Sequence, residues 1–181
     1  MTDSFKEQII KKERTQKDTY TKAVIMFASL ALAFGIILFA LNIPRLAVIG
    51  IFLAALSIYG GFYLCQNLDL EYEYIYTNGD LDIDKIIAQR SRKRLITVNV
   101  KEASDIGRAD DAQDSERTVV VASARREDME DYYLDVKHRD YGNVRVIFTP
   151  DEDMLRVIKS GLPRNLRNKI QVADKPIDEE E

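Results

Sequence analysis

Two apolar stretches constrain this chain more than any other feature. Residues 23–43 (AVIMFASLALAFGIILFALNI) and residues 46–65 (LAVIGIFLAALSIYGGFYLC) contain no charged side chain, and only Pro44 and Arg45 lie between them. At about 1.5 Å per helical residue, each stretch is long enough to cross about 30 Å of hydrocarbon. Because proline readily ends a helix and the link is so short, the sequence predicts an antiparallel hairpin of two transmembrane helices.

The charges that flank the two stretches predict their orientation. Six Lys or Arg residues lie within residues 1–22, only Arg45 lies in the turn, and five more lie between residues 85 and 94. The positive-inside rule therefore places both termini in the cytoplasm, in a multi-pass protein of the plasma membrane. A cleaved signal peptide is the alternative, since residues 31–33 (ALA) resemble a cleavage site, but the charged leader and the apolar run are too long for one.

The two stretches also contain rows of small residues and no Asp, Glu, Lys, Arg or His side chain. The absence of these groups favours an anchor over a transporter. Small residues allow helices to approach closely in lipid, either between the two spans or between copies of the chain in a homo-oligomer, and packing of the spans on each other is the favoured reading. The small residues are Gly50, Ala54, Ser57 and Gly61 in the second stretch and Ala28, Ala31 and Gly35 in the first.

The remainder of the chain is acidic. Residues 66–181 hold 19 Lys and Arg residues and 26 Asp and Glu residues, a net charge of −7. Nucleic-acid binding depends on cations that neutralise phosphates, so nucleic acid is not an expected partner. The single cysteine and the single histidine exclude an intrachain disulfide and a Cys-based zinc site, and we expect no cofactor.

Residues 71–84 (EYEYIYTNGDLDID) predict a β-hairpin. Asn78-Gly79 is the sequence typical of a two-residue turn with positive φ at both positions. Strict alternation then places one set of side chains on a core face and the acidic set on a face exposed to water. The core set is Leu70, Tyr72, Tyr74, Tyr76, Leu81 and Ile83, and the acidic set is Glu71, Glu73, Asp80, Asp82 and Asp84.

The segments that follow predict further strands and a closing helix. The strands are expected at residues 92–100, 116–124, 132–138 and 143–148, with a weaker one near 101–107. Thr149, Pro150 and Glu152 form a helix-start pattern with Thr149 as N-cap, and the helix is expected over 150–160. Its apolar stripe, Met154, Leu155, Ile158 and Leu162, should cover the open end of a sheet. The predicted fold class is a membrane-anchored α+β chain in which six or seven antiparallel strands over 69–164 form a barrel or sandwich.

This order of elements resembles the pleckstrin-homology-like (PH-like) barrel, in particular the bacterial PH-like domains attached to membrane spans. The segments FKEQIIKKE, EYEYIYTNGDLDIDKI and RKRLI, together with the two spans, resemble an uncharacterised family of small two-span membrane proteins of Firmicutes. The resemblance covers residues 4–164 and implies a PH-like cytoplasmic domain, without an activity or site residues. The chain has no tryptophan for the usual position in the last helix of eukaryotic PH domains, which weakens a transfer of phosphoinositide binding.

The basic segment QRSRKR is the main candidate site. Arg90, Arg92, Lys93 and Arg94 either contact anionic lipid headgroups or pair with Glu73, Asp80, Asp82 and Asp84 across the strands, and pairing is the favoured reading. A calcium site at the three aspartates is disfavoured, because Lys85 and Ser91 stand where a calcium loop needs Gly and Glu.

Three further segments carry smaller expectations. Residues 1–22 are a cytoplasmic amphipathic segment in which SFKEQIIKKER reads as a short helix, with Lys11 and Lys12 facing headgroups or the helix packing on the domain. For Cys65, a buried or lipid-facing thiol is favoured over acylation, and His138 is expected to be structural. Residues 165–181 read as a basic and then acidic disordered tail.

These features predict a module that is not an enzyme. No nucleophile–base pair or pair of carboxylates stands out as a catalytic group, and no metal site is expected. The first hypothesis is a membrane-anchored PH-like module that presents an interaction surface to an unidentified membrane or cytoplasmic protein at the inner leaflet. The alternative is a module that responds to anionic membrane lipids through residues 90–94.

Overall fold

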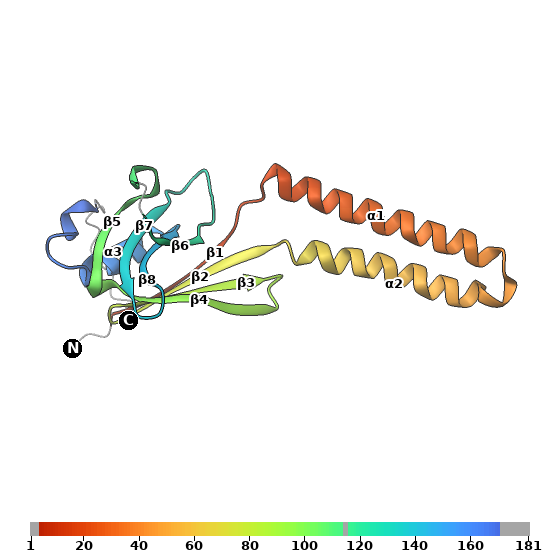
Figure 1. Cartoon of the computed structure of the whole chain (residues 1–181), viewed down its shortest axis with the longest axis horizontal. Helices are drawn as coiled ribbons and strands as arrows, with labels where there is room; N and C mark the ends of the chain where they lie inside the picture. The colour runs from red at the N-terminus through yellow and green to blue at the C-terminus, as the bar shows by residue number, and fades with distance from the viewer. Residues whose placement is uncertain (1–3, 114–115, 171–181) are drawn as a thin grey trace, which may run out of the picture. The chain divides into compact units, whose positions relative to one another are not determined.

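The computed structural model describes residues 4–113 and 116–170. The chain divides into two compact units. A helical unit comprises residues 13–70 and 87–91, and a β unit comprises residues 1–12, 71–86 and 92–181. Figure 1 shows the elements of both units along the chain.

The helical unit is an antiparallel pair of helices. Helix α1 spans Gln16–Leu41, the short segment η1 spans Pro44–Leu46, and helix α2 spans Ala47–Gln66. Both helices are long and apolar enough to cross a membrane, and only 17% and 22% of their most apolar windows are buried. The core helix of a soluble protein would be mostly buried, so this exposure of apolar surface is what a pair of lipid-facing helices requires.

Small residues bring α1 and α2 into contact. On α2, Gly50, Ala54 and Gly61 are buried, as the sequence predicts for the packing of the two helices on each other. A Cβ atom at Gly50 would lie 2.2 Å from the Cβ of Ala40. The prediction for α1 is wrong: Ala28, Ala31 and Gly35 are exposed. The residues of α1 that pack against α2 are Ser29, Ala33 and Ala40, on a neighbouring stripe that is equally rich in small residues.

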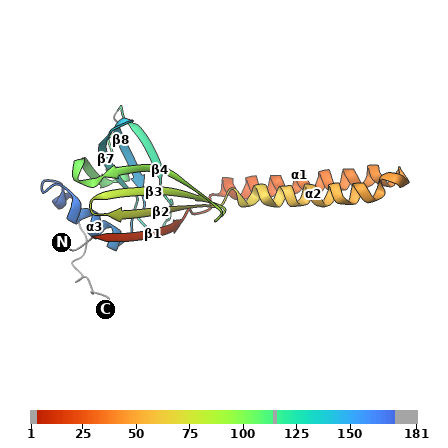
Figure 2. The same cartoon turned by 90° about the horizontal axis from the view of Figure 1, so that it is seen from below.

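The β unit consists of two four-stranded sheets. The first contains β1 (Phe5–Lys11), β2 (Leu70–Thr77), β3 (Asp80–Ile87) and β4 (Ser91–Asn99) in this order. The second contains β5 (Ala103–Arg108), β7 (Tyr132–His138), β8 (Gly142–Phe148) and β6 (Thr118–Ala122) in the order β5-β7-β8-β6. Figure 2 shows β1 to β4 side by side. Three short 3₁₀ segments are η2 (Val100–Glu102), η3 (Ala109–Asp111) and η4 (Arg167–Lys169).

Strand β1 occupies the place where the sequence predicts an amphipathic helix, so that prediction is wrong. Phe5 pairs with Thr77 and Lys11 with Glu71, in an unbroken antiparallel register. Gln8 and Ile10 face inward while Ile9 is exposed, so the segment also fits the two-residue period of a strand. The partner strand, rather than local propensity, therefore decides its conformation.

The helical hairpin is thus inserted between the first two strands of the first sheet. The chain leaves β1 at Lys11, runs through α1 and α2, and enters β2 at Leu70. Because Lys11 and Glu71 are directly paired, the end of β1 and the start of β2 lie next to each other. The chain therefore enters and leaves the helical hairpin at the same end.

The tight turn after β2 has the conformation that its sequence predicts. Asn78 has φ 52° and Gly79 has φ 110°, between the last residue of β2 and the first of β3. The hydroxyl of Tyr74 on β2 donates to the carbonyl of Ala122 at 2.5 Å and accepts from the backbone N–H of Thr149 at 3.2 Å. Tyr74 thereby joins the two sheets, and its burial raises the pKa of its hydroxyl above the ordinary value.

Helix α3 (Glu152–Gly161) closes the core. Met154, Leu155, Ile158 and Leu162 are all buried, as the apolar stripe predicts. Its N-cap is Asp151, whose carboxylate accepts from the N–H of Met154 at 2.6 Å, so the prediction of Thr149 as N-cap is wrong. The hydroxyl of Thr149 is instead buried and donates to Asp131.

Two further expectations differ from the structure. Strand β6 runs parallel to β8, because long connections rather than tight turns flank it and no hairpin fixes its direction. Residues 165–170 do not belong to a disordered tail, since Leu166 and Ile170 are buried in the core. Residues 171–181 of the expected tail lie outside the described residues.

Candidate interaction surfaces

The structure divides the basic segment between the two units. Within the β unit, Arg92 pairs with Glu73 at 2.8 Å, and Arg94 pairs with Asp82 at 2.9 Å and also with Asp84. These pairs are the cross-strand contacts that the sequence analysis favours for the basic segment. Lys93 is exposed.

Arg90 belongs to the helical unit. Its guanidinium lies over the ring of Tyr63, 4.4 Å from the centroid, and donates to the side-chain oxygen of Asn67 at 3.2 Å. Tyr63 and Asn67 are at the last turn of α2. Arg90 is therefore the member of the basic segment that lies where a helix would leave a membrane, and stacking on an aromatic ring holds it there.

Other cations at this end of the hairpin share one carboxylate. Asp69 accepts from Lys22 at 2.7 Å and from Arg14 at 3.2 Å. Partial burial opposes ionisation of Asp69, but these two cations outweigh it and hold the pKa of the carboxyl below its usual value. The contacts tie the start of α1 to the end of α2. Lys11 is exposed at the end of β1, and Lys12, which has a partner, is half-buried.

The acidic face of the first sheet is only partly exposed, contrary to expectation. Glu73 is 1% exposed and Asp84 is 4% exposed, because the side chains of neighbouring strands cover them. Burial raises the pKa of Glu73; the charge of Arg92 opposes this rise, while Glu7 on β1 and Asp84 on β3 add to it. The alternation of polar and apolar residues correctly predicts which side chains form the acidic face. It does not predict how far the arginines cover that face.

The outer face of the second sheet carries a buried charge cluster. Arg145 forms a bidentate pair with Asp135, at 2.7 and 2.8 Å, and Arg117 also pairs with Asp135. Arg145 donates in addition to the carbonyl of Gln113 at 2.6 Å, and its guanidinium lies 4.7 Å from the ring centroid of Tyr133. In this part of the outer face of the second sheet, the charged side chains therefore bind one another.

Strand β6 presents apolar side chains to solvent. Val119 is 51% exposed and Val121 is 46% exposed, although both belong to a strand at the end of its sheet. Val121 is paired with Ile147 of β8, which is half-buried, so apolar surface continues from the edge onto the sheet. The sequence alone does not predict a site at these residues. The run TVVVA is the signal that indicates them. Side chains alternate between the two faces of a strand, so three consecutive valines cannot all face the core.

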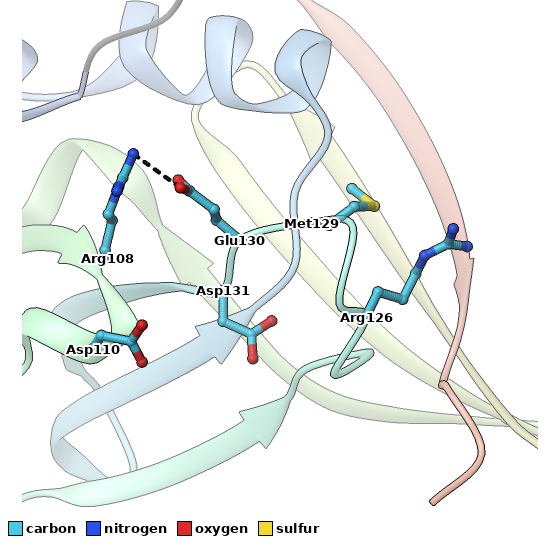
Figure 3. Close-up of a pocket in the computed structure, with 6 residues that line it drawn as sticks. All are labelled: Arg108, Asp110, Arg126, Met129, Glu130 and Asp131. Atoms are coloured by element: carbon cyan, nitrogen blue, oxygen red, sulfur yellow. Dashed lines mark ion pairs between the residues drawn. The ribbon is translucent and has the colours of Figure 1, made fainter.

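A small hollow of about 240 Å³ lies beside η3 and the start of β7. Its charges are largely paired: Arg108 lies 2.9 Å from Glu130, and Asp131 accepts from the hydroxyls of Ser123 and Thr149. In Figure 3, Arg108 and Glu130 point toward each other, and Arg126 extends away from them. Two of its three carboxylates, Glu130 and Asp131, are thereby engaged. The lining residues are Arg108, Asp110, Arg126, Met129, Glu130 and Asp131.

The single histidine and the single cysteine have structural contacts. The Nδ1 atom of His138 accepts from the N–H of Asp140 at 3.1 Å, and its ring lies 4.9 Å from the ring of Tyr141. The thiol of Cys65 donates to the carbonyl of Lys22 at 3.6 Å. Among the described residues, no group of three His, Cys, Asp or Glu side chains is arranged to hold a metal ion.

Comparison with known proteins agrees with the fold. No curated protein and no solved structure matches the chain. The sequence profile of the bacterial PH-like domain family DUF6106 matches residues 2–168, which include β1, the helical hairpin and both sheets. The predicted fold class is thereby confirmed, and the chain belongs to this bacterial PH-like domain family.

Proposed function

We propose that this protein is a membrane-anchored adaptor without enzymatic activity, whose PH-like domain binds an extended segment of another protein along the edge strand β6. The observation that carries the proposal is the exposure of Val119 and Val121, 51% and 46%, on a strand that ends its sheet. Exposed apolar edges are a liability for a protein unless a partner covers them.

The helical hairpin supplies the anchor in this proposal. Its two helices are long and apolar enough to span a bilayer, and the pairing of Lys11 with Glu71 brings the chain back to the side from which it left. The excess of Lys and Arg before the first helix and after the second supports a cytoplasmic position of the PH-like domain, by the positive-inside rule.

Strand β6 suits a partner that binds as an additional strand. Its last residue, Ala122, already gives its carbonyl to Tyr74, so the open part of the edge is Thr118–Val121. A partner strand would hydrogen-bond to this edge through its backbone, and alternate apolar side chains would cover Val119, Val121 and the neighbouring Ile147. The expected partner segment is therefore short, extended and apolar at every second residue.

Contact with anionic lipid is the second candidate function. The observation that favours it is the position of Arg90, stacked on Tyr63 at the end of α2. Arg92 and Arg94 are engaged with carboxylates of the first sheet, so they support this function less than the sequence suggests. A headgroup site at this end of the hairpin would depend on Arg90 and on ionic strength.

Site-specific photocrosslinking in native membranes tests the proposed function. A photoreactive residue placed at Val121 should crosslink to one protein in stoichiometric amount, and the same residue at Lys93, exposed on the first sheet, should not. The substitution Val119→Asp should reduce the Val121 crosslink at least about tenfold, because a carboxylate inside an apolar contact costs more than about 1.4 kcal/mol.

Three results would contradict the adaptor. Crosslinks from Val121 that reach only a second copy of the chain would indicate a homo-oligomer. Crosslinks that reach only lipid and disappear on Arg90→Glu would favour the lipid module. A protein crosslink that survives Val119→Asp would place the partner elsewhere.

A further inference from the structure

A buried carboxylate in the first sheet has one oxygen without a hydrogen-bond donor. Glu73 is 1% exposed, and its Oε1 accepts from Arg92 at 2.8 Å. Its Oε2 is buried and has no hydrogen-bond partner among the residues that the structure describes. A buried acceptor left unpaired costs free energy, so an unpaired carboxylate oxygen at this position requires an explanation.

The group that faces Glu73 from the neighbouring strand is another carboxyl group. Strand β1 pairs Glu7 with Ile75 and Ile9 with Glu73, so Glu7 and Glu73 lie diagonally on the same face of the sheet, within reach of each other. Two ionised carboxylates offer only acceptors and repel each other. A single proton between them converts the contact into a hydrogen bond, in which the protonated carboxyl donates to the other.

We propose that Glu7 and Glu73 form a proton-binding site that fastens β1 to the rest of the sheet. The ligand is one proton shared by the two carboxyl groups. This inference does not depend on the proposed partner of β6, since it concerns the opposite sheet.

The surrounding charges agree with uptake of a proton. Burial raises the pKa of Glu73, and this effect together with Glu7 and Asp84 exceeds the opposing effect of Arg92. On the far side, Arg94 neutralises Asp84 without touching Glu73. The charged groups that face Glu73 are Glu7 from β1, Asp84 from β3 and Arg92 from β4, and the directly paired Lys11 and Glu71 lie one step further along the same face.

The sign of the pH dependence follows from the raised pKa. A carboxyl whose pKa is higher in the folded than in the unfolded state contributes stability below its unfolded pKa, and this contribution is lost as the pH rises through the folded pKa. Acidification from neutral pH should therefore tighten the pairing of β1. Because β1 precedes α1 in the chain, the site acts on the strand through which the chain reaches the helical hairpin.

Carboxyl titration by NMR tests the site on the full chain in lipid nanodiscs, with ¹³C-labelled glutamate. In the unmodified protein, the Glu73 carboxyl should titrate above the ordinary value of about 4.3. In Glu7→Gln, the amide N–H₂ supplies a permanent donor to Oε2 and removes the repulsion, so the Glu73 midpoint should fall. Glu102→Gln is the control, since it removes the same charge at an exposed residue of η2.

Thermal unfolding of the same variants provides a second measurement. Glu7→Gln should unfold at a higher temperature than the unmodified protein at pH 8, and the difference should shrink as the pH falls. An ordinary Glu73 midpoint in the unmodified protein would overturn the proposal. A raised Glu73 midpoint that Glu7→Gln leaves unchanged would also overturn it. The same holds if Glu102→Gln lowers the Glu73 midpoint as much as Glu7→Gln does, because neither result requires a proton shared with Glu7.

Discussion

Replacing Gly50 with leucine is expected to separate α1 from α2. A Cβ at Gly50 would lie 2.2 Å from the Cβ of Ala40, an atom fixed to the backbone that cannot rotate away. The helices must then move apart and lose the contacts around Ala54 and Gly61. Overpacking of this kind costs about 1–3 kcal/mol, and more where the backbone must shift.

The chain offers a matched control for this substitution. Gly60 lies on the same helix, and a Cβ atom added at Gly60 would have no atom of the described residues within 4 Å. Gly60→Leu should therefore leave the hairpin intact. Oxidative crosslinking of a Ser29→Cys, Ser57→Cys pair measures the separation, because the Ser57 hydroxyl lies 3.1 Å from the Ser29 carbonyl. With Cys65 replaced by serine, crosslinking should fall severalfold in Gly50→Leu only. Equal crosslinking in both leucine variants would refute this packing.

Replacing Asp135 with alanine should have the largest effect on the β unit. The side chain of Asp135 is 2% exposed and that of Arg145 is 10% exposed, so the substitution leaves a buried guanidinium without its anion. Arg117 loses the same partner. Removing one partner of a buried ion pair destabilises a protein by about 3–5 kcal/mol, because the charge of the other partner stays desolvated.

Urea unfolding, monitored by the circular dichroism of the tyrosine side chains, measures this effect. The control is Glu130→Ala, which breaks the pair with Arg108, where the two side chains are 52% and 60% exposed. Exposed pairs contribute about 0–1 kcal/mol, so the control should stay close to the unmodified protein. If the two variants unfold at the same urea concentration, the cluster around Asp135 does not stabilise the fold as described.

Local patterns were sufficient for the elements whose signals are local. The uncharged stretches predict α1 and α2, Asn78-Gly79 predicts the turn between β2 and β3, and the apolar stripe of α3 predicts its buried face. In each case the residues that determine the structure lie within one turn or one helix of each other.

The elements that could not be predicted depend on distant partners. β1 fits the period of a helix and of a strand, and it becomes a strand because β2, on the other side of the hairpin, pairs with it. The parallel direction of β6 depends on β8, and the burial of Glu73 depends on Arg92. The exposure of Val119 and Val121 could not be predicted either, because β-branched residues favour a strand without indicating which of its side chains are buried.

We propose that a helical hairpin, inserted between the first two strands of a PH-like domain, holds that domain at the cytoplasmic side of a membrane. Cysteine accessibility in intact cells tests it most directly. Two single-cysteine variants in a Cys65→Ser background suffice: Arg45→Cys in the turn between the helices, and Glu102→Cys, exposed on the β unit.

A membrane-impermeant maleimide should label Arg45→Cys in intact cells. It should label Glu102→Cys only after the membrane is permeabilised, because the proposed topology puts the two residues on opposite sides of the bilayer. Labelling of Glu102→Cys in intact cells, or equal labelling of both residues before permeabilisation, would contradict the account.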